Sequence, residues 1–127
     1  EKNKNINIEK IEFINGDRIL NIRLKQNLRQ FELNKASDNS FSLTIKSSYE
    51  KQVISKNSAG VATKYSLKAE VSFEIQHKNK IENVNFVETF VMDKLDDDFE
   101  NRKYEDTIKQ NFANSISQKL LNKLSSI

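Results

Sequence analysis

The sequence predicts an α+β fold, a two-layer sandwich with two amphipathic helices on one face of a mixed, mostly antiparallel four-stranded sheet. Residues 61–76 alternate between apolar and polar side chains, as in a strand with one buried face. Two other segments carry apolar residues at helical spacing. The 127 residues include no proline and two glycines, so no flexible linker is evident and we expect a single domain spanning residues 1–127.

The first strand is expected over residues 6–13, with an irregularity in its middle. Asp17 follows this strand and is a good helix N-cap, because its carboxylate can accept hydrogen bonds from free backbone N–H groups. Apolar residues then follow at spacings of four, four and three, which predicts a helix of about four turns: Leu20, Leu24, Leu28 and Phe31. The basic residues of this segment are expected to face outward: Arg18, Arg23, Lys25 and Arg29.

Three longer strands are expected after a polar loop at residues 34–40. The first covers residues 41–53, where most apolar side chains share one parity, including Val53. A turn around residues 56–60 leads into the alternating strand, whose apolar face begins at Val61. Residues 77–80 turn the chain again, and a third strand is expected over residues 84–92.

The last element predicted is a helix of about 22 residues that follows an acidic connection at residues 93–100. Its apolar stripe runs from Tyr104 to Ile127. Such a helix spans roughly 33 Å, whereas a strand over residues 61–77 spans roughly 55 Å. We therefore expect the hairpin tip, residues 56–64, to extend beyond the core and to need protection or a partner.

The composition argues against several classes of function. The net charge is +3, but the lysines are scattered and form no basic stripe with aromatic residues, so we expect no nucleic-acid binding. The absence of cysteine excludes disulfides and thiolate metal sites in this sequence. The single histidine, His77, lies at an expected turn and is interpreted as a surface residue.

The acidic segment before the last helix has two interpretations: a site for a hard cation, or favourable charges at the helix N-terminus. Its acids lack the glycine and spacing of an EF-hand loop, which favours the second: Asp93, Asp96, Asp97, Asp98 and Glu100. No residue set supports catalysis, so we expect a protein that is not an enzyme and holds no cofactor or metal ion. The aromatic residues are interpreted as core: Phe73, Phe86, Phe90, Tyr104 and Phe112.

Four basic residues are candidates for contact with phosphate or another acidic partner, with ordinary solubility as the alternative. Lys56 and Lys64 flank the expected hairpin tip, and Arg102 and Lys103 precede the expected last helix.

Several segments together resemble a known family. They are Gly16-Asp17-Arg18-Ile19-Leu20, Phe41-Ser42-Leu43-Thr44-Ile45, Gly60-Val61-Ala62-Thr63-Lys64-Tyr65, Asp97-Asp98-Phe99-Glu100, Asn111-Phe112-Ala113 and Leu120-Leu121. In order and spacing the chain resembles LptE, the lipopolysaccharide-assembly lipoprotein, most closely its forms from alphaproteobacteria. The resemblance covers nearly the whole chain.

The resemblance implies an outer-membrane lipoprotein on the periplasmic side that sits as a plug inside the β-barrel of LptD and helps deliver lipopolysaccharide to the outer leaflet. It implies a lipid anchor on a cysteine, which we would place upstream of Glu1. The family's basic residues have their nearest counterparts here in Lys56, Lys64, Arg102 and Lys103, which would bind lipopolysaccharide. The partner-contacting hairpin would present small, polar or aromatic residues: Ser55, Asn57, Ser58, Gly60, Thr63 and Tyr65.

A second hypothesis is a free periplasmic or secreted domain that recognises a peptide or protein at a sheet edge. The upstream sequence discriminates the two, since a signal peptide ending directly before a cysteine favours the lipoprotein. A third, an enzyme using the acidic segment, would require a response to divalent cations.

Overall fold

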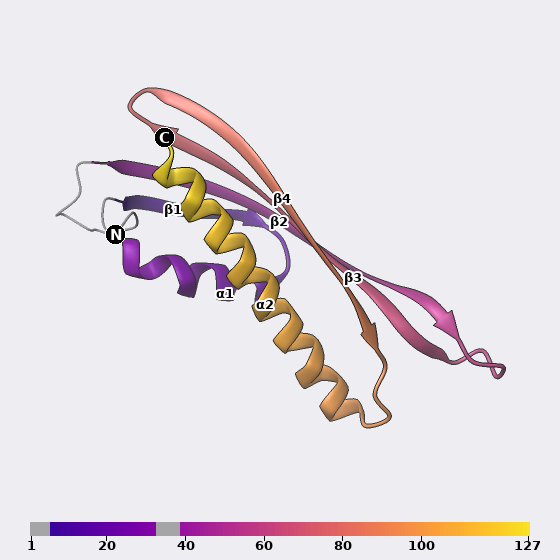
Figure 1. Ribbon diagram of the computed structural model, residues 1–127. Helices are drawn as coiled ribbons and strands as arrows, with labels where there is room; N and C mark the ends of the chain where they lie inside the picture. Colours follow the sequence, from indigo (N-terminus) through magenta and orange to yellow (C-terminus); the bar gives the residue numbers. More distant parts are fainter. Residues whose placement is uncertain (1–5, 33–38) are drawn as a thin grey trace.

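The predicted α+β fold is confirmed by a computed structural model that describes residues 6–32 and 39–127 (Figure 1). A four-stranded sheet has the order β1-β2-β3-β4, with β1 parallel to β2 and the other neighbours antiparallel. A short 3₁₀ turn, Arg29–Phe31, continues α1. The elements in chain order are β1 (Asn7–Asn15), α1 (Arg18–Leu28), β2 (Ser40–Lys56), β3 (Ala62–His77), β4 (Lys80–Asp93) and α2 (Asp98–Ser125).

The core lies between the sheet and the two helices, which cover the same face of the sheet (Figure 1). The alternation in β3 places every second side chain in this core, with exposures of 1% or less: Leu67, Ala69, Val71, Phe73 and Ile75. The predicted leucine stripe of α1 is confirmed, because Leu20, Leu24 and Leu28 are fully buried. From α2, Ile108 and Phe112 are among the buried residues.

The corner between β1 and α1 requires a glycine. Gly16 has φ +125°, and a Cβ atom there would lie 1.9 Å from the Ser47 hydroxyl oxygen and 2.7 Å from the Ser47 carbonyl oxygen. This close approach lets the Ser47 hydroxyl donate to the Asn21 side chain over 2.6 Å. The corner thereby fixes the start of α1, where Asp17 is the N-cap, as predicted, and accepts from the Leu20 N–H.

Several predicted boundaries are wrong by a few residues. Helix α2 has 28 residues rather than about 22, because Asp98–Glu100 form its first turn instead of belonging to the connection. Arg102 and Lys103, expected before the helix, lie within it. Strand β4 begins at Lys80 rather than at residue 84, and only Lys78 and Asn79, with φ 48° and 65°, turn the chain. Of the expected loop, residues 34–38 lie outside the described residues, and Ser40 already belongs to β2.

The β2–β3 hairpin extends past the N-terminal end of α2 and past both outer strands (Figure 1). Strand β1 pairs with β2 only as far as Lys46, and β4 pairs with β3 only as far as Lys64. The end of the hairpin is therefore a two-stranded ribbon, and the length argument predicted its extension beyond the core but not this pairing. The 28-residue helix α2 spans roughly 42 Å, and β3 spans roughly 53 Å. The strand therefore exceeds the helix in length by less than the sequence predicted.

Three side chains assigned to a buried apolar face are exposed instead. Val53 and Val61 in the hairpin end are 46% and 50% exposed, because no helix covers this part of the sheet. Phe90, expected in the core, is 41% exposed and lies edge-on to the Tyr104 ring with centroids 6.4 Å apart. His77 ends β3 and is half-buried, stacked on Phe41 with ring centroids 4.5 Å apart.

Candidate functional site

The tip of the β2–β3 hairpin is a well-defined turn built on Asn57. The Asn57 side-chain oxygen accepts hydrogen bonds from the backbone N–H of Ala59 (2.9 Å) and of Val61 (3.0 Å). The Gly60 N–H donates to the Asn57 carbonyl over 3.0 Å, and Gly60 has φ +81°, which glycine adopts without strain. These hydrogen bonds fix the conformation of the tip, which is joined to the rest of the sheet by the two hairpin strands alone.

The residues predicted to contact a partner fall into two groups at this hairpin. Asn57, Ser58 and Gly60 are exposed at the tip. Three others lie below the tip and are partly buried: Ser55, Thr63 and Tyr65. There the Thr63 hydroxyl donates to the Ser55 hydroxyl over 3.0 Å, and the Lys51 ammonium lies 4.4 Å from the centre of the Tyr65 ring. The second group therefore also holds the two strands together.

Sequence reasoning missed the apolar character of the tip. Val53, Ile54 and Val61 are each about half exposed. The hairpin end consequently presents aliphatic side chains beside its hydroxyl and basic groups, whereas the sequence interpretation expected a polar contact surface. The alternating pattern of the strand contained these residues, but it does not indicate where the covering helices end.

The four candidate basic residues, Lys56, Lys64, Arg102 and Lys103, are all exposed. Lys64 lies 3.7 Å from the Asp93 carboxylate, and Lys103 lies 3.8 Å from the Glu100 carboxylate. Such exposed pairs stabilise the fold little and leave the ammonium groups accessible. Within residues 6–32 and 39–127, Lys56 and Arg102 take part in no ion pair.

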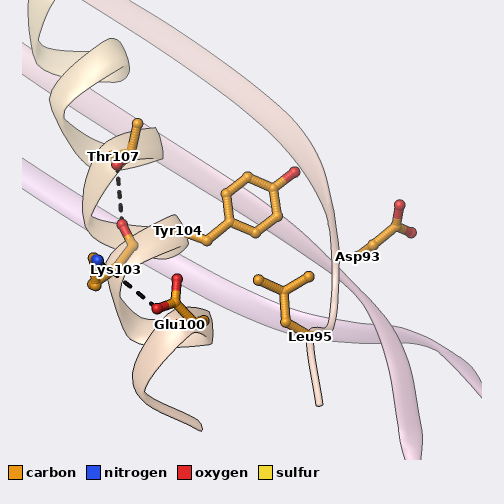
Figure 2. A pocket seen from close by; sticks show the side chains of 6 residues that line it. All are labelled: Asp93, Leu95, Glu100, Lys103, Tyr104 and Thr107. Carbon is orange, nitrogen blue, oxygen red and sulfur yellow. Dashed lines mark hydrogen bonds and ion pairs between the residues drawn. The ribbon is translucent and has the colours of Figure 1, made fainter. Parts of the chain in front are cut away.

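An open hollow of about 510 Å³ lies between the end of β4 and the first turns of α2 (Figure 2). Its lining residues are Asp93, Leu95, Glu100, Lys103, Tyr104 and Thr107. Figure 2 shows the Tyr104 ring reaching from the helix toward the strand end, above Leu95. Because Lys64 pairs with Asp93, the hollow brings two of the four candidate cations to the end of β4.

Exposed apolar side chains belong to the same region as these cations. Leu95 is 38% and Phe99 58% exposed, and the Lys103 ammonium lies 5.2 Å from the centre of the Phe99 ring. The first turns of α2 therefore combine positive charge with apolar surface. Such a combination suits an amphiphilic anion better than a small ion.

A partly buried charge network holds the same end of α2 on the sheet. Glu105 accepts hydrogen bonds from the Tyr49 hydroxyl (2.5 Å) and the Lys51 ammonium (2.8 Å). Burial acts to raise the pKa of Glu105, but the hydrogen bonds from Lys51 and Tyr49 outweigh it and lower the pKa below 4.5. Burial and the hydrogen bond to Glu105 raise the pKa of Tyr49, so the phenol stays neutral.

The acidic segment before α2 supplies a helix cap. The Asp97 carboxylate accepts from the backbone N–H of Phe99 over 2.8 Å and of Glu100 over 3.4 Å. Asp98 and Glu100 lie in the first turn, where negative charge is favourable to the helix dipole. In the described part of the chain, no three His, Asp or Glu residues are grouped as metal ligands.

The fold is shared with solved structures of bacterial lipoproteins. Rare lipoprotein B from Shewanella oneidensis is 17% identical, with a TM-score of 0.59, and the match covers 93% of this chain and 95% of that chain. Lipoprotein B from Nitrosomonas europaea is 17% identical, with a TM-score of 0.60, and 94% and 83% are covered. A candidate lipoprotein from Caulobacter crescentus is 12% identical, with a TM-score of 0.62, and 98% and 90% are covered.

The protein is therefore an α+β sandwich, and the solved structures of rare lipoprotein B share this overall fold. At these identities the likeness establishes the fold alone. No known family profile matches the sequence, and no curated protein matches it. Neither helix, as far as the structure describes the chain, has a stretch long and apolar enough to cross a bilayer.

Proposed function

We propose that this protein is an outer-membrane lipoprotein of the LptE type, to which rare lipoprotein B corresponds. In this role it sits as a plug in the β-barrel of an LptD-type partner and aids delivery of lipopolysaccharide to the outer leaflet. One observation carries the proposal: the fold agrees with rare lipoprotein B over more than nine-tenths of this chain. A lipid-bearing cysteine upstream of Glu1 would tether the chain to the periplasmic side of the outer membrane.

The projecting hairpin is the proposed contact with the barrel. In the part of the chain that the structure describes, its end has no third strand and no covering helix, so its backbone and the side chains of Val53, Ile54 and Val61 are available to a partner. The Asn57 turn reduces the ordering cost of binding, because the tip is already shaped before contact.

Lipopolysaccharide is the proposed ligand of the cations near the hairpin and the start of α2. Lys56, Lys64, Arg102 and Lys103 can donate charge-assisted hydrogen bonds to its phosphates. Exposed apolar side chains at the same end of the molecule, such as Leu95 and Phe99, would suit its acyl chains. The hollow in Figure 2, between these groups, is the proposed centre of contact.

We also propose that the protein catalyses no reaction and binds no cofactor. Its most perturbed titratable groups, Tyr49 and Glu105, hydrogen-bond to each other and, through Glu105, to Lys51. They thereby join α2 to β2 and have a structural role.

The alternative, a free periplasmic or secreted domain that binds a peptide or protein at a sheet edge, has one observation in its favour. Strand β4 is an edge strand of 14 residues with an unbroken register to β3, and Ile81, Val87 and Val91 are exposed along it. An extended peptide could add to this edge.

Co-purification distinguishes the two functions. The lipidated protein, isolated from its own membrane, is expected to bring the LptD-type barrel with it. A variant in which residues 57–60 are replaced by a two-residue turn should keep its thermal midpoint and yield a weaker complex. Recovery without any barrel protein, or an equally strong complex with the shortened hairpin, would contradict the proposed plug.

A further inference from the structure

The outward face of α1 carries basic side chains without acidic neighbours in the helix. Residues 18–31 contain four Arg or Lys residues and no Asp or Glu. Three of these cations and one isoleucine follow at spacings of four, three and four: Arg18, Ile22, Lys25 and Arg29. At 3.6 residues per turn their side chains fall within an arc of roughly 60°. We call these four residues the α1 stripe.

Within residues 6–32 and 39–127, no carboxylate pairs with the positive charges of the α1 stripe. Arg18, Lys25 and Arg29 are exposed, and none takes part in an ion pair within residues 6–32 and 39–127. Lysines on α2 differ, since Lys119 pairs with Glu88 and Lys123 with Glu82. The α1 stripe therefore leaves a local positive potential open to an external anion.

Apolar side chains are exposed beside these cations. Arg18 and Lys25 border a hollow of about 270 Å³ that is also lined by Phe13, Asn21 and Ile22. Ile22 is 41% exposed.

We propose that the α1 stripe docks on an anionic phospholipid surface. Cations flanking exposed aliphatic side chains are typical of helices at a membrane interface, where basic groups meet phosphates and apolar groups reach the acyl boundary. An acidic protein surface would account for the cations but not for the exposure of Ile22 between them. The inference rests on the proposed function, which tethers the chain to a membrane.

The position of the stripe agrees with such a tether. Ile8, near the start of β1, forms a parallel bridge with Glu32, whose N–H donates to the Arg29 carbonyl over 3.0 Å. The Arg29 end of the stripe therefore lies beside the start of β1. The hairpin tip is at the opposite end of the molecule (Figure 1). An anchor upstream of β1 would thus hold the Arg29 end of the stripe near the lipid, while the hairpin extends from the opposite end of the molecule.

Vesicle binding tests the inference directly. The full chain, residues 1–127, is expected to co-sediment with phosphatidylcholine vesicles containing about a third phosphatidylglycerol, and not with pure phosphatidylcholine. Each basic residue near such a surface contributes roughly fivefold, so replacing three should weaken partitioning about 100-fold: Arg18→Gln, Lys25→Gln and Arg29→Gln. Ile22→Ser should weaken it further without changing its salt dependence.

A matched variant controls for net charge. It replaces three exposed lysines elsewhere that have no ion pair in the described residues: Lys46→Gln, Lys78→Gln and Lys80→Gln. It should retain most of the binding. Equal losses in both triple variants, or no preference of the unmodified chain for anionic vesicles, would overturn the inference, and the second result would point to an acidic protein partner. Co-purification with the barrel is a separate measurement. A chain that binds the barrel but not anionic vesicles would therefore contradict the docking surface and leave the proposed function intact.

Discussion

The Lys109 ammonium lies 3.1 Å from the Asp17 carboxylate, which joins the middle of α2 to the first residue before α1. The two side chains are only 11% and 22% exposed. The other oxygen of Asp17 caps α1 by accepting from the Leu20 N–H over 3.0 Å. The Lys109 ammonium also lies 4.3 Å from the centre of the Tyr49 ring on β2. This ion pair therefore connects both helices to the sheet.

Asp17→Ala should lower the free energy of unfolding by about 2–4 kcal/mol, because it removes a helix cap and leaves Lys109 mostly buried without its carboxylate. Asp17→Asn keeps a capping oxygen and should cost distinctly less. Urea unfolding of both variants checks the difference. Equal losses would show that the ion pair with Lys109 alone matters, and a loss below about 0.5 kcal/mol for alanine would contradict both roles.

Acidification should weaken the fold through Glu105. Its pKa is lowered in the folded state, so its contribution to stability is fully present above the unfolded value of 4.5 and is lost as pH falls through the lower folded value. Unfolding by urea, measured from pH 7 down to about pH 3, should show this decline. Glu105→Gln should be less stable at pH 7 and should lose less unfolding free energy as the pH falls. If this variant loses as much stability on acidification as the unmodified protein, Glu105 is not the group responsible.

Phe112→Ala should cost about 3–5 kcal/mol of unfolding free energy, because the side chain is 4% exposed and its removal leaves a cavity in the core. Phe99→Ala is the matched control on the same helix, since Phe99 is 58% exposed, and it should cost less than about 0.5 kcal/mol. Thermal or urea unfolding measures both. Similar losses at the two positions would show that the core is placed wrongly.

Charge reversal tests the proposed contact with lipopolysaccharide. The pairs Lys56→Glu with Lys64→Glu, and Arg102→Glu with Lys103→Glu, should each weaken binding about tenfold or more and reduce its salt dependence. The pair Lys46→Glu with Lys80→Glu carries the same charge change at exposed sites outside the candidate region. Unchanged affinity at low salt in the first two pairs would leave these cations with a role in solubility only.

The sequence predicted the architecture because its two periodicities are clear. The alternation in β3 and the leucine spacing in α1 correspond directly to one buried face each. The start of α2 was missed because residues 98–103 are mainly polar or charged and carry no apolar period. Helix propensity and the Asp97 cap determine this turn, and both are weaker signals than hydrophobic spacing.

The candidate site was less predictable, because its properties depend on contacts between distant residues. The pairing of Lys109 with Asp17 spans 92 positions, and no local pattern indicates it. Val53 and Val61 look like core residues in an alternating strand and become exposed only because the helices do not reach them. Arg18, Lys25 and Arg29 of α1 were correctly expected to face outward, whereas Arg23 is half-buried.

Hydrogen exchange at the hairpin tests the central claim most directly. The ribbon end, residues 54–63, lacks a third strand, and two-stranded ribbons are only marginally stable, so its amides should exchange rapidly in the isolated protein. Buried amides of α2 around Phe112 should exchange slowly and serve as the internal control.

In the complex with the LptD-type barrel, the same hairpin amides should become protected while those around Phe112 remain as slow as before. This result would support the hairpin as the element that enters the barrel. Slow exchange at residues 54–63 already in the free protein, or fast exchange there that persists in the complex, would contradict the account.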